Sequence, residues 1–136
     1  MRLPQLACAL MLLCVGSSAM ASKWVNVTSS ADYTAAIDTD SLKRSGDLAL
    51  FWERRTFPNY GKLPNGSNYN VSRSRDTINC ALDTYMASSI DFLLDGRVIE
   101  TSTMPNPMDI RPDSVGAAIE KVVCTNGSPG ANKLRE

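Results

Sequence analysis

The chain of 136 residues contains no histidine, and this absence excludes most of the common catalytic and metal-binding arrangements. Ser-His-Asp and Cys-His sites both need an imidazole base, and zinc sites usually combine histidine with cysteine. The sequence also lacks an SxxK motif, a GxGxxG motif and a P-loop, so neither lysine-assisted acyl transfer nor nucleotide binding is indicated. We therefore expect that the protein is not an enzyme and has no catalytic residue, no cofactor and no metal.

Long apolar runs are also missing, apart from one close to the N-terminus. The segment Leu6 to Val15 is apolar but too short to span a bilayer, which takes about 20 residues. A basic residue precedes this segment and Ala19-Met20-Ala21 follows it, which is the layout of a secretory signal peptide. We expect residues 1–21 to be removed on export and no transmembrane segment to remain.

The chain has no excess of charge of either sign, with 14 basic and 14 acidic residues. Nucleic-acid-binding domains are usually plainly basic, so we expect no nucleic-acid partner. The length that remains after the signal peptide suits one domain with a modest core. We assign residues 22–125 to this domain and residues 126–136 to a flexible polar tail.

Cysteine is scarce in the mature chain, which keeps only Cys80 and Cys124 of the four cysteines. In the oxidising compartment that a signal peptide implies, two cysteines have a single intramolecular pairing. A bridge across this separation of 44 residues would contribute about 4 kcal/mol in the chain-entropy model. We therefore predict one structural disulfide.

Most of the mature chain has the patterns typical of strands. Asp95-Gly96 predicts a tight hairpin, and Thr39-Asp40-Ser41 and Ser45-Gly46-Asp47 predict two further turns. Residues 58–70, rich in proline, glycine and asparagine, predict a long mobile loop, and the three prolines of residues 104–112 exclude a central strand or a helix interior. The predicted strands cover residues 24–27, 33–38, 48–57, 72–85, 90–94 and 97–101.

One helix is predicted near the C-terminus. Asp113 or Ser114 can cap its start, and apolar residues then recur at i, i+3, i+4, i+7 and i+8, which forms one stripe. The helix ends at Cys124, so the disulfide ties its end to the strand that holds Cys80, and the stripe faces the sheet. We predict an α+β domain: an antiparallel sheet of five or six strands with one C-terminal helix packed on one face and one disulfide. The stripe consists of Val115, Ala118, Ile119, Val122 and Val123.

A local excess of base lies between positions 54 and 75. The strand at 48–57 is apolar on both faces at its start and charged towards its end, which indicates that it runs from the core to a rim. If the strands near positions 50 and 75 pair, their arginines meet at that rim, where guanidinium groups can hold carboxylate or sulfate in a two-pronged way. The alternative is a solvated sheet edge on which arginine discourages aggregation. The candidate ligand-binding rim consists of Arg54, Arg55, Lys62, Arg73 and Arg75, with Tyr60 and Tyr69 from the intervening segment.

Two segments carry a more specific signal. In YTAAIDTDSLKRSGDLALFWERRTF, Asp38-Thr39 is followed by Ser41, Gly46 and Trp52, and in IRPDSVGAAIEKVVC a Pro-Asp-Ser segment opens a helix that ends in cysteine. With a signal peptide and a tryptophan before them and a DG hairpin between them, they resemble the surface-adhesin protein E family of Gram-negative bacteria. The resemblance covers residues 23–124.

Membership of that family implies an antiparallel sheet with a helix packed on it and a homodimer as one oligomeric state. It also implies binding to host proteins such as vitronectin, laminin or plasminogen. Lipoprotein processing needs a small residue before the modified cysteine, but Leu13 precedes Cys14 here. We therefore expect export across the inner membrane to the periplasm or the cell surface, without a lipid anchor.

The function that we expect is that of a non-enzymatic envelope binding module, adhesin-like, for host extracellular matrix or serum proteins or for another envelope protein. An alternative stays open: a periplasmic enzyme inhibitor, or a small periplasmic enzyme of unknown substrate, that works through residues 58–70. A rigid protruding loop would favour the inhibitor, and a pocket with two carboxyl groups of raised pKa would favour the enzyme.

Overall fold

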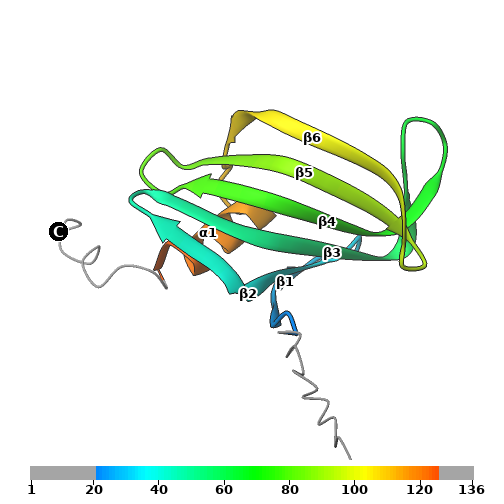
Figure 1. Cartoon of the computed structure of the whole chain (residues 1–136), viewed down its shortest axis with the longest axis horizontal. Coiled ribbons are helices and arrows are strands. Elements are labelled where there is room, and N and C mark those ends of the chain that lie inside the picture. The colour runs from blue at the N-terminus through cyan, green and yellow to red at the C-terminus, as the bar shows by residue number, and fades with distance from the viewer. Residues whose placement is uncertain (1–20, 126–136) are drawn as a thin grey trace, which may run out of the picture.

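The computed structural model describes residues 21–125, in which strands make up one antiparallel sheet and a single helix follows them (Figure 1). The elements are β1 (Trp24–Ser29), β2 (Thr34–Ser45), β3 (Leu48–Lys62), β4 (Asn68–Asn79), β5 (Thr84–Leu94), β6 (Arg97–Asp109) and α1 (Val115–Thr125). Each strand pairs with the strand that precedes it in the sequence, so the order in the sheet is β1-β2-β3-β4-β5-β6. The predicted signal peptide, except Ala21, and the predicted tail lie outside the described residues.

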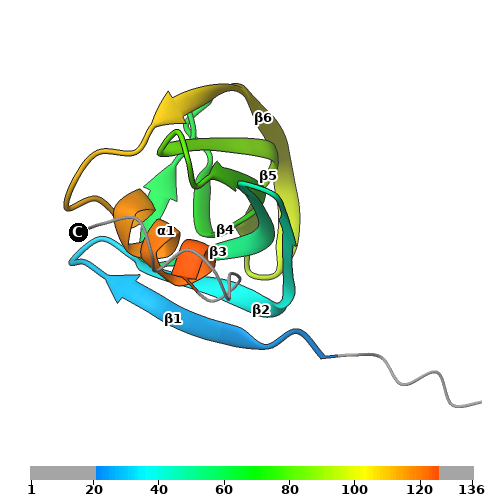
Figure 2. The same cartoon turned by 90° about the vertical axis from the view of Figure 1, so that its left-hand side faces the viewer.

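The sheet curls around α1, which lies against its concave face beside β1 and β2 (Figure 2). We call the face that packs against α1 the inner face and the opposite face the outer face. Side chains alternate between the two faces along a strand, so Phe51 packs into the core under α1 and Trp52 lies on the outer face. The buried residues of this core are Ile37, Ala49, Phe51 and Ile78 from the sheet and Ile119 and Val123 from α1.

The helix α1 has the N-cap and the buried apolar stripe that its sequence predicts. Ser114 Oγ accepts a hydrogen bond at 3.2 Å from the backbone N–H three residues later, which is the N-cap arrangement. Ile119 and Val123 of the predicted stripe are buried against the sheet. The disulfide between Cys80 and Cys124 joins the end of α1 to the turn after β4, with the two Cα atoms 5.8 Å apart. These features confirm the predicted α+β fold.

The predicted turn at residues 39–41 is wrong, because β2 continues through it as a bulged strand. The register between β2 and β3 shifts between Asp38 and Lys43. Ser41 Oγ fixes the bulge, since it donates to the carbonyl oxygen of Asp38 at 2.7 Å and accepts from the backbone N–H of Trp52 at 3.0 Å. A bulge of this kind bends a strand and redirects its side chains.

The predicted mobile loop at residues 58–70 is also wrong, because β3 and β4 extend into it as a hairpin that projects from one end of the sheet (Figure 1). Regular pairing stops at Thr56 and resumes at Gly61. Pro58 lies in the interval, where no ladder N–H is needed. Gly61 is required where pairing resumes, since a Cβ there would collide with the ring of Tyr69.

The single strand predicted over residues 72–85 is in fact the end of β4, a turn and the start of β5. In this turn Asn79 Oδ1 accepts hydrogen bonds from the backbone N–H groups of Ala81 and Leu82, and Asp83 adopts φ 52°. Leu82 is 69% exposed in this turn. The hairpin at Asp95-Gly96 is confirmed, with φ of 50° and 82° as a type I′ turn requires.

The proline-rich stretch at residues 104–112 lies mostly in β6, which is an edge strand. An edge strand has one side of its hydrogen-bonding ladder free, so Pro105 and Pro107 are tolerated there. No helix within residues 21–125 is long and apolar enough to cross a bilayer.

Candidate functional site

Three of the five basic residues in the predicted rim lie together on the outer face. The register of β3 and β4 pairs Arg54 with Arg73 and Trp52 with Arg75. Directly paired residues have Cβ atoms about 5 Å apart on one face of the sheet. We call the surface formed by Trp52, Arg54, Arg73 and Arg75, with Trp24 beside it, the Arg–Trp face.

Two of these arginines have a partner within the protein and one does not. The guanidinium carbon of Arg54 lies 4.5 Å from the ring centroid of Trp24, a cation–π contact. Arg73 Nη2 lies 3.3 Å from Asp91 Oδ2. Arg75 is exposed and forms no ion pair with any residue in the part of the chain that the structure describes. The Arg–Trp face therefore has positive charge that its own residues do not neutralise.

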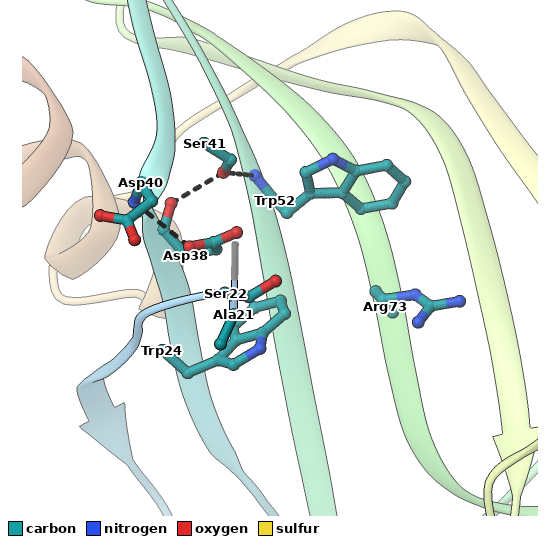
Figure 3. Close-up of a pocket in the computed structure, with 8 residues that line it drawn as sticks. All are labelled: Ala21, Ser22, Trp24, Asp38, Asp40, Ser41, Trp52 and Arg73. Atoms are coloured by element: carbon teal, nitrogen blue, oxygen red, sulfur yellow. Dashed lines mark hydrogen bonds between the residues drawn. The ribbon is translucent and has the colours of Figure 1, made fainter. Parts of the chain in front are cut away.

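The side chain of Trp52 separates two shallow hollows on the Arg–Trp face. The first has a volume of about 560 Å³ and lies between Trp24 and Trp52, with Arg73 across from them (Figure 3). The second has a volume of about 280 Å³ and is lined on the other side of Trp52 by Lys43 and Arg75. Each hollow thus combines an indole wall with a cationic side chain.

Two acidic residues line the first hollow, and the exposed Asp40 lines the second hollow as well. The other acid, Asp38, has a structural role. Asp38 is 7% exposed, and its Oδ1 accepts the backbone N–H groups of Lys23 at 2.9 Å and Asp40 at 3.2 Å. These bonds fasten the start of β1 to the bulge of β2. The bulge therefore fixes the shape of the hollow, and Asp38 is already committed to backbone donors.

The remaining residues of the predicted rim do not join the Arg–Trp face. Arg55 lies on the inner face, where its Nε is 2.5 Å from Glu53 Oε1. Tyr60 and Lys62 are exposed on the projecting β3–β4 hairpin. Tyr69 packs in a row of aromatic rings, edge-on to its neighbours, and supports that hairpin. Side chains alternate between the two faces along β3, so Arg55 and its neighbour Arg54 lie on opposite faces of the sheet. Tyr60 and Lys62 lie further along β3, on the part of the strand that projects beyond the sheet.

The sequence prediction missed a buried polar cluster on the inner face. Glu53 is 1% exposed and Asp76 is 0% exposed. Glu53 is the first charged residue of the strand at 48–57, so this strand is still in the core at the position where we expected it to reach the rim. A signal was present, because Glu53 alternates with Phe51 and Asp76 alternates with Ile78, which places both acids on the core side. Their proximity could not be predicted, because it depends on the register between β3 and β4.

Burial dominates the electrostatics of this cluster. Desolvation raises the pKa of Asp76 far above its ordinary value, and the neighbouring Glu53 raises it further, whereas the charge of Arg55 offsets only part of the effect. Burial also raises the pKa of Tyr85, with Asp76 adding to the effect. Burial alone would lower the pKa of Arg55, but the charge of Glu53 more than compensates and raises it.

Within residues 21–125, no group of three or more cysteine, aspartate or glutamate side chains is arranged so that it could hold a metal ion. The described residues offer instead a cationic outer face with aromatic walls and an inner cluster of two acids and one arginine. The outer arrangement suits binding to an anionic surface.

The sequence places the chain in a class of surface adhesins. The sequence profile of the family described as surface-adhesin protein E matches residues 24–125, and the chain belongs to this family. It is an adhesin family and not a family of enzymes, so the protein is an adhesin-like envelope protein.

Two solved structures share the fold. The first is the structure of Haemophilus influenzae protein E, which has 15% sequence identity to this chain and a TM-score of 0.55, over 76% of this chain and 84% of that one. The second is the crystal structure of protein E from non-typeable Haemophilus influenzae, with 15% identity, a TM-score of 0.50, and coverage of 80% of each chain. No curated protein sequence matches the chain.

Proposed function

We propose that this protein binds an acidic segment of a host extracellular matrix or serum protein through the Arg–Trp face, without catalysing a reaction. The observation that supports this proposal is the outward alignment of Arg54, Arg73 and Arg75 on neighbouring strands, with Trp52 between two hollows. Guanidinium groups bind carboxylates with two parallel hydrogen bonds. Tryptophan and arginine are also the residues that contribute most to binding energy at protein interfaces.

The pairing of Arg54 with Arg73 favours a binding role over a purely structural one. Like charges directly opposite each other on two strands lower the stability of a sheet. Trp24 contacts Arg54 and Asp91 pairs with Arg73, which offsets part of this repulsion. The exposed Arg75 next to them has no ion-pair partner among the described residues. An anionic ligand placed across the three guanidinium groups would remove the repulsion, so the arrangement gains stability on binding.

Charge reversal on the outer face tests the proposal. We expect Arg73→Glu with Arg75→Glu to abolish binding to immobilised vitronectin and laminin, measured by surface plasmon resonance at 0.15 M salt. The matched control is Arg97→Glu with Lys121→Glu, which changes the net charge equally at two exposed positions elsewhere. Both double variants should unfold within about 1 kcal/mol of the wild type, since surface ion pairs contribute little. Equal binding by the two double variants would contradict the proposal.

Binding to a host protein also requires that the domain is displayed outside the outer membrane. We expect protease treatment of intact producing cells to digest the protein while a periplasmic marker survives. Survival of both proteins would place the domain in the periplasm and would leave another envelope protein as the partner. Light scattering of the purified protein distinguishes a monomer from the homodimer.

The projecting β3–β4 hairpin supports a second candidate, a protease inhibitor. The tip of the hairpin is ordered by backbone hydrogen bonds between Leu63 and Ser67 at 2.9 Å and between Gly66 and Leu63 at 2.9 Å. Tyr60 is 58% exposed on the hairpin. Inhibition of periplasmic proteases by the wild type, and its loss in Tyr60→Ala, would support this role. Wild-type protein without inhibitory activity would exclude it for the proteases tested.

A further inference from the structure

A second site lies on the inner face, at the N-terminal end of α1. A cavity of about 220 Å³ opens there between α1, β6 and the middle of the sheet. Its walls are apolar, and its floor carries the side chains of Glu53, Arg55 and Tyr85. Asp109 and Arg111 lie exposed at its mouth. The apolar wall consists of Ile78, Met104, Met108, Ile110 and Ile119.

A fully buried acid lies under this floor. Asp76 is 0% exposed, and neither of its carboxyl oxygens has a hydrogen-bond partner of normal geometry among the described residues. The register pairs Asp76 directly with Phe51 on β3 and Ala87 on β5. Three of its further neighbours on the inner face are Ile78 along β4, Glu53 diagonally across on β3 and Tyr85 diagonally across on β5. All three line the cavity. Asp76 is not part of the lining itself and is fully buried next to it.

The cluster lacks one positive charge. Glu53 and Asp76 are two buried carboxyl groups, and Arg55 is the one cation in the described part of the chain that acts on both of them. Both Glu53 oxygens accept from Arg55, at 2.5 Å from Nε and 3.3 Å from Nη2, so this guanidinium is already committed to Glu53. An unpaired buried carboxylate is strongly unfavourable. Asp76 must therefore hold a proton, which it can donate to Glu53, or must lie close to a second cation.

The other groups around Asp76 do not supply that cation. From β3 it faces Glu53 and Arg55, and from β5 it faces Tyr85. On β4 the hydroxyl of Ser74 lowers the pKa of Asp76 but carries no charge, and Tyr33 approaches Arg55 from the turn before β2. The residues of β2 and α1 in this region are apolar or small. Burial accordingly raises the pKa of Asp76, which keeps it protonated at neutral pH in the absence of a ligand.

We propose that this cavity binds a small amphipathic amine, whose ammonium group lies on the Glu53–Asp76 pair and whose apolar body lies against Met104 and Met108. The volume exceeds the 150 Å³ or so of a cavity that holds benzene, so a single ring with a two-carbon arm is a suitable size. The ammonium replaces the proton of Asp76, which leaves to solvent, and the charge of the site is unchanged. An anionic ligand would instead place a second negative charge beside that of Glu53.

Isothermal titration with phenethylamine tests this site on the purified protein. Two probes of similar size serve as controls, neutral 2-phenylethanol and anionic 3-phenylpropanoate. We expect phenethylamine to bind about tenfold or more tightly than either control. Titrations at pH 7 in buffers of different ionisation enthalpy should show release of about one proton per amine bound. Equal or tighter binding of the anion, amine binding without proton release, or no binding at millimolar concentration would overturn the proposal.

Two variants localise the binding. Asp76→Asn keeps the shape of the side chain but removes its charge, so it should bind phenethylamine about tenfold more weakly and release no proton. Gly116 lines the cavity, and Gly116→Leu should fill it and abolish binding, with circular dichroism as the check on folding. Unchanged affinity in a folded Gly116→Leu protein would place the amine elsewhere. The Arg73→Glu, Arg75→Glu protein should bind the amine as tightly as the wild type does. The experiments therefore test amine binding in the cavity and ligand binding at the Arg–Trp face independently of each other.

Discussion

The buried acid Asp76 should make the stability of the protein fall as the pH rises from 5 to 8. Its pKa is raised in the folded state by burial and by Glu53, whereas an aspartate in the unfolded chain has a pKa of about 3.9. Between these two values the folded protein holds a proton that the unfolded chain has released. The unfolding free energy then falls by about 1.4 kcal/mol per pH unit, or about 4 kcal/mol from pH 5 to pH 8.

Asp76→Asn removes this titration and should flatten the dependence. At pH 5 both folded side chains are neutral and can donate to Glu53, but the unfolded aspartate has already released its proton, so the variant should be more stable by about 1.5 kcal/mol. At pH 8 this difference should have grown to about 5.5 kcal/mol, measured by urea denaturation followed by the fluorescence of Trp24 and Trp52. Asp95→Asn is the control, since this exposed turn residue at φ 50° accepts asparagine and should leave the slope unchanged. A wild-type stability that is flat or rising over this range would refute the reasoning.

Three further variants test the fold. Replacing both Cys80 and Cys124 by serine should lower the unfolding free energy by about 4 kcal/mol in the chain-entropy model, measured by urea denaturation; an unchanged midpoint would contradict this. Gly61→Ala should lower the melting temperature, because the new Cβ collides with the ring of Tyr69; a variant at least as stable as the wild type would show that the hairpin is not packed as described. Ser114→Ala should cost about 1 kcal/mol through loss of the helix cap, with calorimetry as the measurement and an unchanged melting temperature as the contrary result.

The parts of the fold that depend on local sequence could be predicted. The apolar stripe of α1, the cap at Ser114 and the turn at Asp95-Gly96 each follow from residues a few positions apart, and all three are present. The disulfide followed from the count of cysteines in the exported chain. The errors at residues 39–41 and 58–70 have a common cause, because turn-forming residues also occur in strand bulges, and sequence does not separate the two.

The candidate site was predictable only in part. Alternation along β3 already implies that Arg54 and Arg55 lie on opposite faces, and Arg55 is indeed bonded to Glu53 on the inner face. The alignment of Arg54 with Arg73 depends on the register between β3 and β4, which the hairpin and its bulge determine. The same register brings Asp76 close to Glu53, so neither strand alone contains the information that defines the inner cluster.

Adherence of whole cells tests the central claim most directly, because it requires both surface display and the Arg–Trp face. Cells that produce the wild type, the Arg73→Glu, Arg75→Glu variant or the Arg97→Glu, Lys121→Glu control would be counted on surfaces coated with vitronectin or laminin. We expect the wild type and the control to adhere equally, and the outer-face variant to adhere no better than cells without the protein. Equal adherence of all three producing strains, or adherence of none above that background, would contradict the proposed function.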